Sequence, residues 1–391
     1  MFSIVELNDS FNSLFDGKQS KGKGLPVGID GMTGLNFKKN QTCNIQEIKR
    51  GLDSFNTPNN RFEFGVLFQI KRVKKSGGHR HLYVPRIRDQ IVFKCMFEEL
   101  KTVMNVGGLL LNTSPRKYVE RFHEYLDKND GQWVLRTDIS SFYDSIDRSI
   151  LLSELKELNL RESLFMLLKQ WLGNVRYRDS LSLKDQQLQN GLPQGISLSS
   201  LLAEFYLSSV DAKFGLEYFR YIDDIIISCR SREEAREYLS RLKKILNSKG
   251  LEISGLKTQI APLSNGVEWL GLRHYANRVI HADIEKYGEW KQGVVKVIRE
   301  VRNKYPERMT KETDGIIIKK ELFLKVNGYL QGDYQRRTHW YNLILDQGQW
   351  KDFDSYIHGQ IKFALKFYGL TIENSDILPS VQLNVSRVKK G

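Results

Sequence analysis

Residues 219–228 read FRYIDDIIIS, in which two adjacent carboxylates interrupt an otherwise strand-like apolar run. Isoleucine and tyrosine favour strands, whereas two ionised aspartates side by side repel each other and are costly to remove from water without a partner. A bound divalent cation would resolve this conflict. The stretch therefore predicts two short strands, with Asp223 and Asp224 at the turn between them and a metal site at that turn.

A third carboxylate follows another predicted strand, in WVLRTDISSFYDSID at residues 133–147. This segment begins as a strand and gives way at Asp138 to polar, turn-forming residues, and helical patterns separate it from FRYIDDIIIS. The two strands can therefore be neighbours, with Asp138 close to Asp223. Carboxylates that converge in this way would hold two Mg²⁺ ions about 3.5 to 4 Å apart, the separation used in phosphoryl transfer.

The charge balance indicates a polyanionic partner. The 391 residues include 60 Lys and Arg against 46 Asp and Glu, which gives a formal net charge of +14. Nucleic acid is favoured over an anionic membrane surface, and over a basic surface that serves solubility alone. The three cysteines lie far apart, which fits a reducing compartment. Neither a membrane-spanning apolar run nor a secretory signal is visible, so we expect a soluble, cytoplasmic protein.

The remaining patterns predict a mixture of hairpins and helices. Residues 64–85 favour a hairpin with a basic tip, because two β-rich runs flank Lys74-Lys75-Ser76-Gly77-Gly78. Helices are expected at 88–100, within 151–173, from about Ser197 and at 231–250, small hairpins at 251–263 and 267–283, and basic helices from Glu285 to about Leu370.

Several of these motifs occur in the order found in reverse transcriptases. Over about residues 60–275 the chain resembles the bacterial lineage that includes group II intron, retron and abortive-infection-like, defence-associated enzymes. The resemblance is carried by GHRHLYVPRIRDQIV (78–92), LRTDISSFYDSID (135–147), GLPQGISLSSLLAEFYL (191–207), YIDD (221–224), GLKTQ (255–259) and WLGL (269–272), the last as a primer-grip hairpin.

The resemblance implies roles for individual residues. Two Mg²⁺ ions, with Mn²⁺ as a substitute, would be held by the set Asp138, Ile139, Asp223 and Asp224. Lys257 would protonate the departing pyrophosphate as a general acid. The incoming nucleotide would be bound by Arg80, helped by Lys71 or Lys74, by Tyr143 as the residue that senses the sugar, and by Gln194 and Gly195.

The implied fold is α+β, a polymerase right hand with fingers, an antiparallel-sheet palm and a helical thumb. We expect an N-terminal extension at 1–59, fingers at 60–130 with part of 150–195, the palm at 131–275, and the thumb with a C-terminal tail at 276–391. The implied activity is RNA-directed DNA polymerisation from dNTPs on an RNA template. A dedicated non-coding RNA as template, a DNA product, a role in antiphage defence, and a homo-oligomer or partner protein are further expectations.

Other interpretations remain open. A polymerase of the same fold could make RNA or extend without a template, and a retron or mobile-element enzyme would share the motifs. The chain ends about 120 residues after WLGL, which leaves no obvious room for an endonuclease, integrase or RNase H domain and disfavours a self-sufficient mobile element. A catalytically idle nucleic-acid-binding protein would leave the carboxylates unexplained. Individually, Tyr143 could be a core aromatic, Lys257 a solvated lysine and Arg80 a contact to a phosphate backbone.

Overall fold

The computed structural model describes residues 1–19, 28–55, 62–73, 78–104, 114–179, 184–277, 279–282, 284–306, 312–341 and 347–373, with positions 376 and 379. The chain forms two compact units, each built from three segments. The first unit comprises Met1–Thr113, Thr137–Asp223 and Leu239–Thr258, and the second Ser114–Arg136, Asp224–Tyr238 and Gln259–Gly391.

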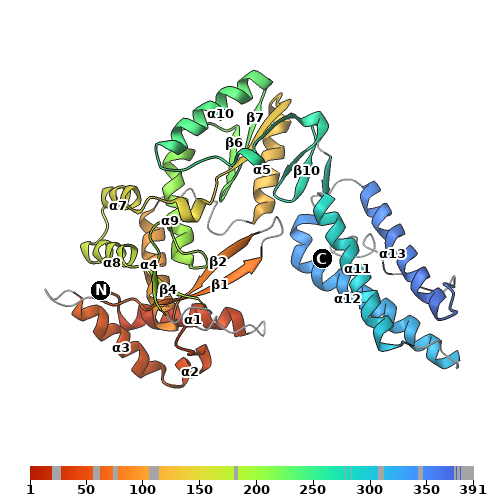
Figure 1. Ribbon diagram of the computed structural model, residues 1–391, viewed down its shortest axis with the longest axis horizontal. Helices are drawn as coiled ribbons and strands as arrows, with labels where there is room; N and C mark the ends of the chain where they lie inside the picture. The colour runs from red at the N-terminus through yellow and green to blue at the C-terminus, as the bar shows by residue number, and fades with distance from the viewer. Residues whose placement is uncertain are drawn as a thin grey trace. The chain divides into compact units, whose positions relative to one another are not determined.

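The first unit holds most of the helices that precede the aspartate pair (Figure 1). Its helices are α1 (Ile4–Gln19), α2 (Gly34–Lys39), α3 (Gln41–Ser54), α4 (Ile87–Val103), α6 (Phe142–Ser145), α7 (Arg148–Glu157), α8 (Glu162–Gly173) and α9 (Ser197–Asp211), with a 3-10 turn at Gly255–Lys257. Its strands are β1 (Leu67–Val73), β2 (His79–Val84), β4 (Arg176–Arg178), β5 (Gln186–Gln187) and β6 (Tyr218–Tyr221).

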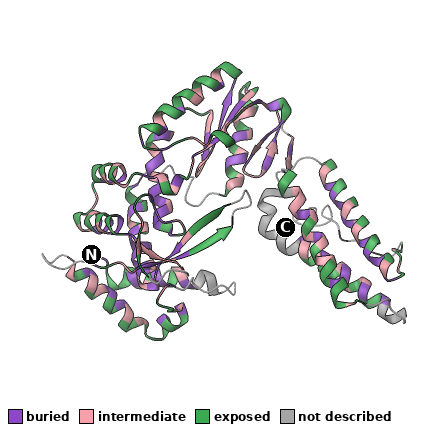
Figure 2. Cartoon of the chain, viewed as in Figure 1, coloured by how far each residue is buried: buried purple, intermediate pink, exposed green. Residues whose placement is uncertain are grey.

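The expected basic hairpin is confirmed as β1 and β2, which pair antiparallel with Arg72 opposite Arg80 and Lys71 opposite His81. They belong to a sheet in the order β2-β1-β4-β5, in which β1 and β4 are parallel. Figure 2 shows the free end of the hairpin exposed and its base buried, in agreement with Leu67 at 2% exposed. The hairpin therefore presents its basic residues to solvent. Lys74 lies outside the described residues.

Helices α4 and α9 pack together in the core of the first unit. Both confirm predicted helices, and both place long runs of aliphatic residues in the interior, as in the fully buried Ile91 and Leu201. Burial of apolar surface stabilises by about 25 cal/mol per Å², so such residues dominate the stability of this unit. Because α9 is buried along most of its length, its packing holds the helix that follows the GLPQG segment in place.

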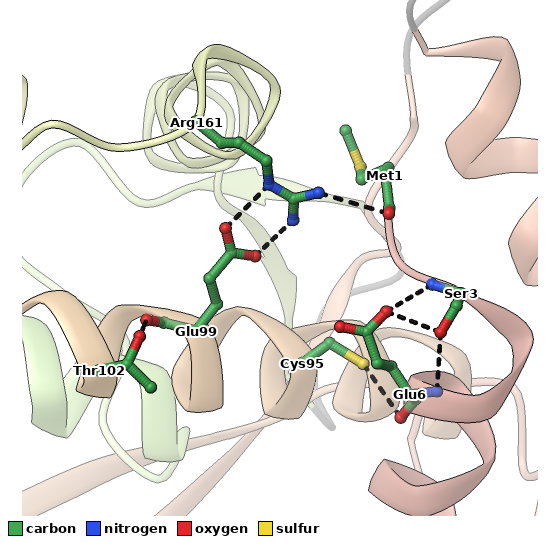
Figure 3. Close-up of polar contacts among 7 residues, drawn as sticks. All are labelled: Met1, Ser3, Glu6, Cys95, Glu99, Thr102 and Arg161. Carbon is green, nitrogen blue, oxygen red and sulfur yellow. Dashed lines mark hydrogen bonds and ion pairs between the residues drawn. The ribbon is translucent and has the colours of Figure 1, made fainter.

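The N-terminal helix α1 packs against α4, and a polar cluster joins the two (Figure 3). Arg161, which precedes α8, forms a bidentate ion pair with Glu99 of α4 at 2.9 and 2.5 Å. Its guanidinium also donates to the carbonyl of Met1 at 3.4 Å. The Cys95 thiol lies beneath α1, 3.1 Å from the Ser10 hydroxyl and 3.6 Å from the Glu6 carbonyl. The first residues are thus an integral part of the first unit.

The second unit contains a sheet, a small three-stranded layer and the C-terminal helices (Figure 1). Its elements are α5 (Pro115–Lys128), β7 (Asp224–Cys229), β8 (Gln259–Pro262), a 3-10 turn at Leu263–Asn265, β9 (Val267–Trp269), β10 (Leu272–His274), β11 (Ile280–Ala282), α11 (Ile284–Lys304), α12 (Glu312–Tyr341) and α13 (Gln347–Phe367). Strand β3 (Trp133–Asp138) and helix α10 (Arg232–Asn247) run across the division between the units.

The hairpin expected at 251–263 is wrong. Strand β8 pairs antiparallel with β3, with Val134 opposite Ala261, and β3 lies between β8 and β7. Ile253 forms only an isolated bridge to Ile139, and the 3-10 turn at Gly255–Lys257 separates it from β8. Local pattern could not distinguish a hairpin from a strand whose partner lies more than a hundred residues away.

The hairpin expected at 267–283 is confirmed and extended by a third strand. The order is β11-β10-β9, and β10 pairs antiparallel with both neighbours. Leu270 and Gly271 both have positive φ, at 52° and 76°, as a type I′ turn requires. WLGL therefore forms the tight end of a hairpin.

The C-terminal helices expected from Glu285 onward are confirmed. Helix α11 packs against both α12 and α13 (Figure 1). Trp290 of α11 stacks on Trp350 of α13 at 5.9 Å between ring centres with an angle of 5°. Aromatic side chains between these helices supply large buried area, which stabilises their packing. Among the described helices, none combines the length and apolar character needed to cross a membrane.

The expected α+β class is confirmed, since both units combine helices with antiparallel strand pairs. One polar feature of the second unit was not predicted. His274 on β10 is fully buried, its Nε2 lies 3.1 Å from the Trp269 carbonyl, and its Nδ1 lies 2.9 Å from Nε2 of His123 on α5. Burial, followed by the proximity of His123, lowers the pKa of His274 to about 3. The ring is therefore neutral and couples α5 to the β10 hairpin.

We expect this histidine to make the chain less stable in mild acid. Between the ordinary pKa of about 6.5 and the folded value of about 3, the unfolded chain binds a proton that folded His274 does not. The free energy of unfolding should fall by up to about 1.4 kcal/mol per pH unit as the pH drops through this window. Urea unfolding at pH 7.5, 6.0 and 5.0 measures this fall in the free energy of unfolding.

The matched comparison is His274→Gln against His79→Gln, because His79 is exposed on β2. His274→Gln should lose about one proton's worth of the pH dependence seen in the parent chain, and His79→Gln controls for the loss of an exposed histidine. Parallel curves for all three proteins would contradict the assignment.

Candidate active site

The aspartate pair lies at a tight turn, as predicted. Strand β6 ends at Tyr221, Ile222 and Asp223 form the turn, and Asp224 begins β7. Ile222 has φ = 59°, in the left-handed region that a β-branched residue rarely adopts. Such a conformation costs about 1 to 3 kcal/mol and persists only where surrounding contacts determine it, often at functional sites.

Asp138, at the end of β3, is brought to the same place as Asp223. The backbone N–H of Ile139 donates to the carbonyl of Asp223 at 3.0 Å. On its other side the carbonyl of Asp138 accepts the N–H of Ser254 at 2.8 Å, and its carboxylate forms an ion pair with Lys257 at 2.8 Å. The predicted meeting of Asp138 with Asp223 is therefore present in the structure, and the structure adds contacts from Ser254 and Lys257 to Asp138.

The two carboxylates repel each other. Burial raises the pKa of Asp223, and the charge of Asp138 raises it further, whereas Lys257 and Arg80 lower it. Carboxylates held close together at a partly buried site are typical of catalytic residues and metal ligands. Within the described residues no group of three or more His, Cys, Asp or Glu side chains is arranged for a metal ion.

Asp224 faces a different partner. Its carboxylate lies 3.4 and 3.5 Å from Nε and Nη2 of Arg136 on β3, with both side chains partly buried. Arg136 was not predicted, although a cation in the strand that also supplies Asp138 was a visible signal. Asp224 is therefore paired with a cation, whereas Asp223 is repelled by the carboxylate of Asp138.

Tyr143, on the short helix α6, is partly buried and fixed at both ends. Its hydroxyl donates to the Ser200 hydroxyl of α9 at 3.3 Å, and its carbonyl accepts the N–H of Leu192 at 2.7 Å. Burial raises the pKa of Tyr143, and the charges of Asp223 and Arg80 also act on it. The ring therefore belongs to the same electrostatic environment as the aspartates, and Ser200 is its unpredicted anchor.

The GLPQG loop connects this region to the β1–β2 hairpin. The carbonyl of Gln194 accepts the N–H of Tyr83 on β2 at 2.7 Å. Gly195 has φ = 100°, and a Cβ there would lie 3.2 Å from the Tyr83 carbonyl, so only glycine fits easily. Arg148 holds the start of the loop by donating to the carbonyl of Gly191 at 2.7 Å.

The basic residues of the hairpin are exposed. The charge of Arg80 on β2 lowers the pKa values of both Asp223 and Tyr143. Lys71 on β1 instead forms a long ion pair with Asp179 at 3.8 Å. Arg80 therefore acts on the site through its charge, whereas Lys71 is paired with Asp179.

Arg220, the second residue of FRYIDDIIIS, was also missed. It is buried and ion-paired with Asp211 and Glu204 of α9. An arginine inside an otherwise apolar strand was the signal that could have found it, because a buried guanidinium requires acidic partners.

Comparison with known proteins identifies the family. Residues 73–274, more than half of the chain, match the family described as reverse transcriptase (RNA-dependent DNA polymerase). The COX1/OXI3 intron 2 protein of Saccharomyces cerevisiae is 27% identical over 177 residues, which cover 43% of this chain and 20% of that protein. The chain therefore spans about a fifth of the length of this curated relative.

Two telomerase structures are also similar. That of Candida albicans in complex with a TWJ fragment of telomeric RNA is 12% identical, with a TM-score of 0.44 over 77% of this chain and 61% of that one. That of apo telomerase from Candida tropicalis is 12% identical, with a TM-score of 0.46 over 90% and 70%. On the match over residues 73–274, the chain belongs to the reverse transcriptase family.

Proposed function

We propose that this chain is an RNA-directed DNA polymerase, which adds dNTPs to a primer 3′ hydroxyl by two-metal-ion phosphoryl transfer. The observation that carries the proposal is the meeting of Asp138 and Asp223, held by the Ile139 amide, with mutual repulsion that helps to raise the pKa of Asp223. A purely structural pair would be expected to avoid this repulsion. Membership of the reverse transcriptase family supports the same reaction.

The donor set fits divalent cations. Carboxylate and carbonyl oxygens are the ligands that Mg²⁺ prefers, and Mn²⁺ accepts the same set. We assign Asp138 and Asp223 as the principal ligands, with the Ile139 backbone and Asp224 completing the set. Asp224 is the weakest member, because its carboxylate is already paired with Arg136. When bound, the ions would activate the primer hydroxyl and neutralise charge on the leaving pyrophosphate.

The remaining residues bind and orient the nucleotide. Arg80, helped by Lys71, would clamp the β and γ phosphates, and Tyr143 would occupy the space that a ribose 2′ hydroxyl needs. Gln194 and Gly195 would support the base pair between nucleotide and template. Lys257, whose side chain is 54% exposed beside Asp138, would donate a proton to the pyrophosphate. Positioning and electrostatics of this kind supply most of the rate in phosphoryl transfer.

Primer extension by the purified full chain tests the proposal. With Mg²⁺ and an RNA template annealed to a DNA primer, we expect template-directed incorporation of dNTPs in preference to rNTPs. Extension that ignores the template sequence would favour a template-independent enzyme, and a preference for rNTPs an RNA-making one. Nucleic-acid binding without any incorporation would overturn the proposal in favour of an idle binding protein.

We further propose that the chain copies one dedicated non-coding RNA in the bacterial cytoplasm and acts in defence against phage. The resemblance of SLSSLLAEFYL to defence-associated enzymes supports this role, and the charge of +14 suits a polyanionic partner such as RNA. The fingers, palm and thumb boundaries expected from the sequence belong to the same proposal, as does a homo-oligomer or partner protein.

The match to a yeast intron protein favours a second candidate, an enzyme that serves an intron. Sequencing the RNA and DNA that copurify from cells carrying the native flanking DNA separates the two. One enriched RNA with matching complementary DNA, and fewer plaques than with Asp223→Ala, supports defence. An intron transcript without protection supports the second candidate. Random cellular RNA without matching complementary DNA contradicts both.

A further inference from the structure

Arg220 is the most deeply buried cation beside the aspartate turn, with a side chain 2% exposed. Its Nε and Nη2 donate to the two carboxylate oxygens of Asp211 at 2.8 and 2.6 Å, and its Nη1 lies 3.0 Å from the Glu204 carboxylate. The same Nη1 donates to the backbone carbonyl of Ile222 at 2.8 Å. A guanidinium is a rigid planar fork, so anchoring two of its nitrogens on Asp211 fixes the direction of the third.

The contact to Ile222 reaches the peptide that immediately precedes Asp223. The next peptide is also fixed, because the carbonyl of Asp223 accepts the N–H of Ile139. Peptide units are planar, so holding the units on both sides of one Cα determines its two backbone dihedrals. Arg220 and Ile139 together therefore fix the direction in which the Asp223 side chain leaves the backbone.

The backbone at this position needs such support. Among the described residues, Ile222 is the one β-branched residue with a clearly positive φ. A left-handed conformation at such a residue is strained, and without a partner for its carbonyl the turn could relax. Relaxation would rotate the 222–223 peptide and redirect the carboxylate that follows it.

We propose that Arg220 is a positioning residue that holds the YIDD turn in its strained form and thereby aims Asp223 at the metal and the reacting phosphate. This inference rests on the proposed polymerase function. Arg220 touches neither nucleotide nor metal in the proposal. It acts through the Ile222 carbonyl, and helix α9, which also carries the Ser200 anchor of Tyr143, supplies the two carboxylates that orient it.

A purely structural ion pair is the competing explanation. Buried ion pairs often add little net stability, because desolvation cancels their attraction, and removal of one partner leaves the other charge uncompensated. The chain offers a matched control in Lys249, whose side chain is 8% exposed and pairs with Glu154, while its ammonium donates to the Ser209 hydroxyl at 2.8 Å. Lys249 lies in the same unit, and its ammonium pairs with Glu154 and Ser209 rather than with the turn at residues 222–224.

The experiment compares Arg220→Lys with Lys249→Met. Arg220→Lys keeps a cation beside Asp211 and Glu204 but loses the guanidinium Nη1 that donates to the Ile222 carbonyl. Thermal unfolding, Mn²⁺ binding by electron paramagnetic resonance without substrate, and steady-state incorporation on an RNA template are measured for both variants and the parent chain. For Arg220→Lys we expect kcat and Mn²⁺ affinity each to fall about 10- to 100-fold, as when a group supporting a metal ligand is removed.

The KM for dNTP should change by less than about threefold, since Arg220 makes no contact with the nucleotide in the proposal. Lys249→Met should lose thermal stability but keep the parent's Mn²⁺ affinity and kcat. Equal losses in both variants would reduce Arg220 to a structural role, and unchanged Mn²⁺ affinity and kcat in Arg220→Lys would overturn the inference. If the parent chain incorporates no nucleotide, the polymerase proposal fails, and the Mn²⁺ comparison still decides whether Arg220 aims Asp223.

Discussion

Replacement of Asp223 by Asn will reduce nucleotide incorporation by roughly a thousandfold or more, because a lost metal-binding carboxylate removes several kcal/mol of transition-state stabilisation. The same change should leave the thermal unfolding temperature unchanged or raise it. The pKa of Asp223 is raised by burial and by repulsion from Asp138, so its ionised form is disfavoured in the folded chain at neutral pH. A neutral amide of the same shape removes that cost.

Single-turnover incorporation and thermal unfolding of the same preparation measure the two effects. Asp144→Asn is a suitable control, because Asp144 is an exposed carboxylate in the same LRTDISSFYDSID segment. It should keep incorporation within a few-fold of the parent. If Asp223→Asn were active, or if it unfolded at a markedly lower temperature, the carboxylate would be structural and the proposed site would be wrong.

The second large effect is expected at Tyr143. Its change to Ala should lower the preference for dNTPs over rNTPs by about 10- to 200-fold, since one contact at a pocket wall is worth about 1 to 3 kcal/mol. The ring is held by Ser200 and by the Leu192 amide, so its position is well defined before any nucleotide binds. Incorporation of matched dNTP and rNTP opposite one template base gives the ratio.

Tyr143→Phe separates the ring from its hydroxyl. Phe keeps the bulk and loses only the bond to Ser200, so discrimination should stay within a few-fold of the parent. An unchanged ratio in Tyr143→Ala would instead assign the side chain to the core. If Tyr143→Phe lost as much discrimination as Tyr143→Ala, the hydroxyl rather than the volume of the ring would be responsible.

The meeting of Asp138 and Asp223 was predictable because two adjacent aspartates in an apolar run, and an aspartate at the end of another strand, conflict with burial unless a partner or ion compensates their charge. The turn, the β1–β2 hairpin and helices α4, α9 and α10 were predicted for a related reason. Each is specified by local periodicity and by turn residues within about twenty positions.

The partners of these residues were not predictable in the same way. Arg136 reaches Asp224 across 88 positions of sequence, and His123 reaches His274 across 151. The pairing predicted for β8 was wrong for the same reason, because β8 pairs with the distant strand β3 rather than with a neighbour across a local turn. Local pattern shows that a polar group is buried and must be satisfied, and only the three-dimensional fold shows which group satisfies it.

The packing of α1 over α4 has a practical consequence for labelling chemistry. Burial raises the pKa of Cys95 to about 11, so this thiol stays protonated and shielded at neutral pH. Cys229 is buried as well, whereas Cys43 on α3 is exposed, and all three cysteines lie in the described part of the chain. A maleimide dye or spin label should therefore attach at one position of the native chain, and no cysteine needs to be removed to obtain a single attachment point.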